Sequence, residues 1–290
     1  MIPLIVSILC SSLIFVIFKL FPKYGINTFQ AIVFNYFTAF TCGILLFGKD
    51  WNPKALESGN WPYFVVLSAV LFISLFIVMG ISSQKNGVAL TSIAGKMSMG
   101  LSMLFMIGLY SEPLSFLKIS GILLAFLGVF LVSFAKSNDG KSSNSIWLLI
   151  VLFVGSAILD VVLNYVQKFE FQHIPASLFS AFGFGLAGAI GFTILVIQLL
   201  RKSTKFELKN ILAGIILGIP NYFSIYLLIL SYKSTGWTDS TVLAIMNVST
   251  VLISAVIGFI AFRENVTIRK IIGLLAAVSA IILLYFANLN

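Results

Sequence analysis

Charged residues are scarce in this sequence. They make up 9% of its 290 positions, whereas hydrophobic residues make up 60%. A soluble domain carries about 25% charged residues, so this chain has too few to cover a water-exposed surface. Its apolar residues form runs of about 20, the length that a helix needs to cross a bilayer. A transmembrane β-barrel is excluded, because barrel strands are short and alternate apolar with polar residues. The sequence predicts an all-α polytopic membrane protein.

Histidine and cysteine are also rare. His173 is the single histidine, and the two cysteines, Cys10 and Cys42, lie in separate apolar runs. These residues predict neither a metal site nor a disulfide. The sequence contains no Walker motif, no Rossmann glycine pattern and no nucleophile elbow. We therefore expect no cofactor, no metal and no catalytic residue, and we predict that the protein is neither an enzyme nor an ATP-driven pump.

Long apolar runs predict ten transmembrane helices joined by short connections. The net charge of +9 does not predict nucleic-acid binding, because the cations lie in these connections, where they orient helices and meet anionic lipid. A polar linker at residues 138–145 divides the chain near its middle. The predicted helices are residues 2–21, 29–47, 62–82, 87–109, 115–135, 146–168, 176–199, 210–232, 236–262 and 266–287.

The two sides of the linker repeat each other. Residues 111–134 match residues 263–286 without a gap, with Glu112 opposite Glu264, and further matches at an offset of 149 extend the repeat along the chain. Residues 1–137 and 146–290 are therefore predicted to form two five-helix repeats. Because five is odd, the second repeat must enter the membrane from the opposite side. Such inverted repeats occur in many secondary transporters, with the substrate site where the halves meet.

Two acid-led turns give the repeat its most specific local feature. Glu112 begins the sequence Glu-Pro-Leu-Ser and Glu264 begins Glu-Asn-Val-Thr, and a glycine follows six residues after the Ser or Thr. With ten helices in two repeats, these turns resemble the EamA-type family of the drug/metabolite transporter superfamily. The resemblance implies alternating-access transport of small metabolites, often outward, by a multi-pass protein of the plasma (inner) membrane. It supplies no universal substrate motif.

Only two charged residues lie deep within the predicted helices, Lys96 and Asp160. A charge near the centre of a membrane helix costs about 2.5–3.5 kcal/mol on insertion scales, so such residues are usually functional. Lys96 aligns with Ile245 in the other repeat, which means that the repeat itself does not require a charge there. The two side chains are expected either to form a structural ion pair or to stand as two poles beside a polar substrate.

Asp160 belongs to a polar stripe along one helix face, with Ser156, Asn164 and Gln167 at spacings of three and four residues. Such a stripe faces either a wet cavity or a neighbouring helix that it hydrogen bonds. Other amide and phenol groups at depth are candidates for the same two roles. The predicted substrate-binding residues are Lys96, Asp160, Asn164, Asn221, Tyr226 and Asn247.

Small residues predict where helices approach one another closely. Gly214 and Gly218 form a GxxxG pattern, and Gly183, Ala187 and Gly191 repeat at the same spacing. Pro220, two residues after Gly218, is expected to kink its helix, as a hinge or as a static bend.

The sequence therefore predicts a secondary transporter of a small polar or amphipathic metabolite, such as an amino acid, with export favoured. Asp160 is also the candidate carrier of a coupled proton. The partners expected are the small-molecule substrate and the lipid bilayer, with no nucleic acid. The alternatives are a structural or sensory partner protein and a membrane enzyme acting on lipid. The latter would need clustered nucleophiles, carboxylates or histidines, which the sequence does not offer.

The orientation of the chain is open from the sequence. The connections that follow the odd-numbered helices contain twelve lysines and arginines, and the other connections contain five. The positive-inside rule would thus place both termini outside the cell. The family resemblance implies that both termini lie in the cytoplasm.

Overall fold

The structure is a computed structural model that describes residues 1–50, 59–110, 115–133, 145–235, 239–264 and 266–287. These ranges contain ten α-helices and no strand, which confirms the predicted all-α fold. Predicted helical residues 134–135 and 236–238 lie outside the described residues, as does most of the linker. The helices are α1 Ile2–Leu20, α2 Thr28–Phe47, α3 Trp61–Lys85, α4 Val88–Tyr110, α5 Phe116–Ser133, α6 Ile146–Phe169, α7 Ala176–Leu200, α8 Leu208–Ser234, α9 Asp239–Ala261 and α10 Ile268–Ala287.

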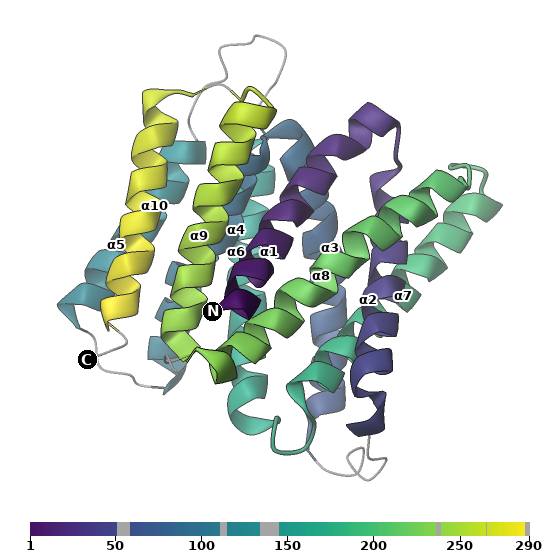
Figure 1. Cartoon of the computed structure of the whole chain (residues 1–290), viewed down its shortest axis with the longest axis horizontal. Coiled ribbons are helices and arrows are strands. Elements are labelled where there is room, and N and C mark those ends of the chain that lie inside the picture. Colours follow the sequence, from purple (N-terminus) through teal and green to yellow (C-terminus); the bar gives the residue numbers. More distant parts are fainter. Residues whose placement is uncertain (51–58, 111–114, 134–144, 236–238, 265, 288–290) are drawn as a thin grey trace. The chain divides into compact units, whose positions relative to one another are not determined.

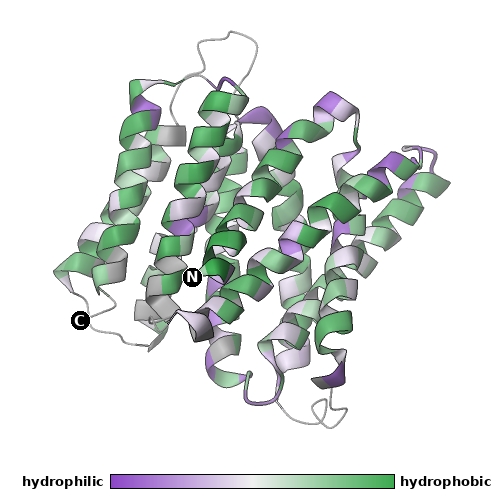
Figure 2. Cartoon of the chain, in the orientation of Figure 1, coloured by the Kyte–Doolittle hydropathy of each residue, from purple (hydrophilic) through white to green (hydrophobic). Residues whose placement is uncertain are grey.

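Seven of these helices, as far as the structure describes them, are long and apolar enough to cross a membrane: α1, α2, α3, α4, α6, α7 and α8. Figure 2 shows apolar residues along most helices and hydrophilic residues at several of the links between them. Large apolar side chains are exposed along the helices; Leu45, for example, is 79% exposed. Helices satisfy their own backbone hydrogen bonds, so such segments are stable in lipid. The chain is an integral membrane protein.

The helices form two compact units, which we call the first unit and the second unit. The first unit contains residues Met1–Leu20, Val78–Val161 and Ser224–Asn290, and the second contains Phe21–Ile77 and Val162–Phe223. The chain passes from one unit to the other after α1 and again within α3, α6 and α8. Each unit therefore draws on both sides of the linker. The predicted division of the sequence into repeats at residues 1–137 and 146–290, and their inverted arrangement, stay predictions.

In the first unit, α5 and α10 lie side by side (Figure 1). They belong to the two matching stretches that revealed the repeat. A Cβ added to Gly128 of α5 would lie 3.2 Å from the backbone nitrogen of Ala277 and 3.2 Å from the carbonyl oxygen of Gly273, both on α10. The two backbones therefore approach closely at these small residues. Helix α9 packs against α1, α4 and α10 in the same unit.

In the second unit, α2 packs against α7 and against the N-terminal half of α8. A Cβ on Gly214 would lie 2.7 Å from the carbonyl oxygen of Ala31, and a Cβ on Gly218 would lie 2.7 Å from that of Asn35. The predicted close packing at the GxxxG pattern is confirmed. Helix α8 continues through Pro220, whose expected kink and hinge role stay predictions.

Candidate functional site

Asp160 lies on α6 within the first unit and is partly buried. The Oγ atom of Ser98, on α4, lies 3.1 Å from Asp160 Oδ2 and 2.7 Å from the carbonyl oxygen of Gly95. The single hydroxyl proton of Ser98 therefore serves two acceptors. Sequence reasoning missed Ser98, although the repeat offers a signal, because Ser98 aligns with Asn247, which was selected.

Lys96 stands two residues before Ser98 on α4 and is also partly buried. Lys96 and Asp160 are side chains of opposite charge type within the first unit. Both side chains belong to the described part of the chain, and they form no direct ion pair there; Ser98 provides the direct contact with the carboxylate instead. Of the two arrangements expected from the sequence, the structural ion pair is not formed between these described residues, and the two poles beside a polar substrate stay a prediction.

Asn247 reaches the same stretch of α4 from α9 and is 7% exposed. Its Nδ2 atom lies 3.7 Å from the sulfur of Met99, the residue that follows Ser98. Asp160 and Asn247 thus contact adjacent residues of α4. The structure gathers Lys96, Asp160 and Asn247 around one turn of this helix.

The other three predicted residues are not gathered in this way. Tyr226 lies in the first unit, partly buried in the C-terminal half of α8. Asn164 and Asn221 belong to the second unit, where Asn164 is partly buried and Asn221 is 5% exposed. The role of all three in substrate binding stays a prediction.

Helix α9 carries further polar side chains on the same helix face as Asn247. Thr250 and Ser254 follow at spacings of three and four residues, so they share a helix face with Asn247. Both are fully buried, and their hydroxyl oxygens have no hydrogen-bond partner in the described structure. The hydroxyl oxygen of Ser12 on α1, a residue that is 1% exposed, also has no hydrogen-bond partner in the described structure. Buried hydroxyls in this state are natural sites for water or for a polar ligand.

Glu264, the acid of the second acid-led turn, binds the start of α4. The backbone N–H of Val88 donates to Glu264 Oε1 at 2.6 Å, and that of Ala89 donates to Oε2 at 3.4 Å. The carboxylate thus caps the helix that carries Lys96, where the helix dipole favours a negative charge. Gly87 precedes α4 with φ +97°, and a Cβ there would lie 2.6 Å from the carboxylate. The repeat mate, Glu112, lies outside the described residues.

Comparisons with known proteins identify the family. The model of the EamA-like transporter family matches residues 2–134. A relative from Haemophilus influenzae, named only as an uncharacterized protein, is 31% identical over 293 residues, which is 98% of this chain and 98% of that protein. The chain belongs to the EamA-like transporter family. The resemblance to this family within the drug/metabolite transporter superfamily, drawn from the acid-led turns and the repeat, is confirmed.

A solved crystal structure shares the fold of this EamA-like chain. The TM-score is 0.60, with 15% identity, and the match covers 98% of this chain and 99% of the other. At this identity the likeness concerns the fold alone.

The second unit of this EamA-like protein contains an apolar hollow of about 510 Å³. Apolar residues from α2, α3 and α7 line it, four of them aromatic, and none of the six predicted site residues takes part. Its residues are Phe37, Phe40, Trp61, Pro62, Val65, Phe182, Gly185, Leu186 and Ala189. This hollow offers no polar group to orient a hydrophilic substrate, so the charged cluster on α4 is the better candidate site.

No cluster of three or more metal-ligating side chains occurs among the residues that the structure describes. Cys10 and Cys42 are both free and partly buried. The polar groups on α4, α6 and α9 provide an ammonium, a carboxylate, an amide and hydroxyls. Such a set can bind a small polar molecule by charge and hydrogen bonding.

Proposed function

We propose that this EamA-like protein is a secondary transporter that moves a small polar or amphipathic metabolite, such as an amino acid, out of the cell by alternating access. The binding site is formed on α4 with contributions from α6 and α9. Family membership and the membrane-helical fold support the transporter class. The deep charges support a substrate that carries charge itself.

One observation carries the substrate class. Lys96 and Asp160 lie in one unit and have opposite charge types, but they form no direct ion pair in the described structure. An unpaired charge at membrane depth is costly, so each group gains most from a partner of opposite charge. A zwitterion offers a carboxylate to Lys96 and an ammonium to Asp160. An α-amino acid has both groups on the same carbon atom.

The remaining roles follow from chemistry. The Asn247 amide both donates and accepts hydrogen bonds and so fits the polar part of the substrate. Asn164, Asn221 and Tyr226 stay candidates for binding the substrate, each within its own unit. We assign the protein to the plasma (inner) membrane. Two inverted five-helix repeats would supply the two access states of the cycle.

Transport in proteoliposomes tests this function. Purified protein is reconstituted and uptake of a panel of radiolabelled amino acids and sugars is measured. Lys96→Met is expected to abolish transport of the accepted substrate while the protein still inserts and remains folded. Lys85→Met, at the exposed end of α3, is the matched control and should transport normally. Unchanged transport in Lys96→Met would refute the assigned role.

Proton coupling is tested with Asp160→Asn. If Asp160 carries the exchanged proton, a pH gradient drives transport by the wild type but not by Asp160→Asn. The variant then transports the substrate only down the substrate's own concentration gradient. A pH-gradient response that persists in Asp160→Asn would exclude this residue as the proton carrier and favour facilitated diffusion with coupling elsewhere.

A further inference from the structure

The α1–α2 and α7–α8 links of the second unit and the first turn of α8 contain five exposed cations, which we call the basic face: Lys23, Arg201, Lys202, Lys205 and Lys209. The same segments contain one acid, Glu207, so four positive charges remain in excess. The links join the ends of α2, α7 and α8, three helices with the length and apolarity of membrane spans. The cations therefore stand at the level where a bilayer presents its headgroups.

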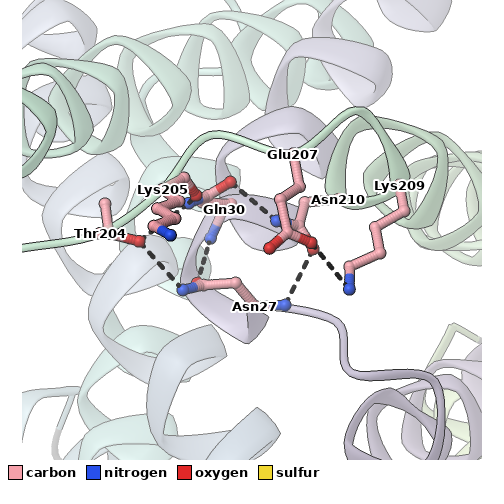
Figure 3. A network of polar contacts seen from close by, with 7 residues as sticks. All are labelled: Asn27, Gln30, Thr204, Lys205, Glu207, Lys209 and Asn210. Carbon is pink, nitrogen blue, oxygen red and sulfur yellow. Dashed lines mark hydrogen bonds and ion pairs between the residues drawn. The ribbon is translucent and has the colours of Figure 1, made fainter.

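A buried polar network fixes the two links to each other (Figure 3). Asn27 donates its backbone N–H to Asn210 Oδ1 at 2.9 Å, and Asn210 Nδ2 donates to Gln30 Oε1 at 2.8 Å. Gln30 Nε2 in turn donates to the carbonyl oxygen of Lys205 at 2.8 Å and to Thr204 Oγ1 at 3.1 Å. Gln30 and Asn210 are 0% and 1% exposed. The cations are thus displayed from a rigid base, which lowers the entropy lost when they bind a partner.

Two of the cations occupy notable backbone positions. Lys202 follows the C-cap residue of α7 with φ 54°, in the left-handed region that glycine normally fills. Lys209 lies in the first turn of α8, where the helix dipole opposes a positive charge, and it is held at 2.7 Å by Glu207. The helix dipole thus disfavours the charge of Lys209, whereas it favours that of Lys202 at the C-terminal end of α7.

Apolar side chains are interleaved with these cations. Phe206 is 47% exposed, Leu208 is 73% exposed, and Leu200 at the end of α7 is 78% exposed. Tyr24, 62% exposed, lies beside Lys23, whose Nζ is 5.8 Å from the ring centroid. Alternating cations and exposed apolar or aromatic groups at helix ends suit a surface that meets lipid headgroups and the upper acyl chains together.

We propose that the basic face binds the headgroups of anionic phospholipids and anchors this end of the second unit to an anionic leaflet. The partner is a phosphate-bearing lipid: the cations bind its phosphate, and the exposed apolar side chains contact its acyl chains. This inference is independent of the transported substrate.

Native mass spectrometry of the purified full-length protein in detergent tests the proposal. The protein is titrated with phosphatidylglycerol or with phosphatidylcholine, and the retained lipid is counted. The triple variant Lys202→Gln/Lys205→Gln/Lys209→Gln removes exposed charges and leaves the buried network intact. Each lysine near a headgroup contributes about fivefold in affinity, so the triple variant is expected to bind phosphatidylglycerol about a hundredfold more weakly. The single variant Glu207→Gln removes the opposing acid and is expected to bind it more tightly.

The matched control is Lys49→Gln/Lys168→Gln, which removes exposed lysines of the second unit outside the basic face and should bind phosphatidylglycerol as the wild type does. Melting temperatures should be equal across the variants, since every altered side chain is exposed. Three outcomes would each overturn the proposal: wild-type retention by the triple variant, equal retention of phosphatidylcholine, and competition by inorganic phosphate at concentrations equal to those of the lipid.

Discussion

The cap on α4 gives the most direct test of the structure. Glu264→Ala removes the carboxylate that accepts the Val88 N–H at 2.6 Å. A hydrogen bond to a charged group contributes about 1.5–3 kcal/mol. Because Glu264 is partly exposed, we expect its loss to lower the free energy needed to open the first turn of α4 by about 2 kcal/mol. This corresponds to about thirtyfold faster hydrogen exchange at the Val88 amide. Glu264→Gln keeps an acceptor without the charge, and we expect about fivefold from a loss of about 1 kcal/mol.

Hydrogen exchange followed by mass spectrometry, on the peptide that begins at Gly87, measures this effect. Glu207→Ala, which removes an exposed acid in the second unit, should leave that peptide unchanged. Gly258→Ala should act in the same direction as Glu264→Ala, because its Cβ would lie 2.8 Å from Glu264 Oε2 and displace the carboxylate. If the Val88 amide exchanges at the wild-type rate in folded Glu264→Ala, the capping assignment is refuted.

Two further substitutions test the packing of the second unit. Gly218→Ala is expected to lower the melting temperature in detergent, because its Cβ would lie 2.7 Å from a backbone oxygen of α2. The control Gly108→Ala, with no atom within 4 Å of the new Cβ, should keep the wild-type melting temperature. Equal melting temperatures for the two variants would contradict the close approach of α2 and α8. Tyr36→Phe removes the hydroxyl that donates to the Phe72 carbonyl oxygen at 2.6 Å from a side chain 1% exposed, and it should destabilise the protein by about 1 kcal/mol in equilibrium unfolding. An unchanged unfolding free energy would mean that this bond contributes nothing.

The positions of all ten helices could be predicted from the sequence to within a few residues. Their apolar runs are long enough to cross a bilayer, and the connections between them are short, so composition alone marks most boundaries. The two deep charges could be found for the same reason, because a charge inside an apolar run stands out. The close approach of α2 and α8 was also readable, since Gly214 and Gly218 leave room that no larger residue would.

The contacts between residues of different helices could not be predicted from the sequence. Ser98 is an ordinary serine in the sequence, and its contact with Asp160 depends on how α4 and α6 pack. The acid of the turn before α10 was recognisable as a family feature, yet its partner at the start of α4 is 176 positions away along the chain. Hydropathy is a property of each residue taken separately, so it determines which stretch of the sequence forms a membrane helix. Contacts between helices depend on the shapes of two surfaces distant in sequence, and only the tertiary structure decides them.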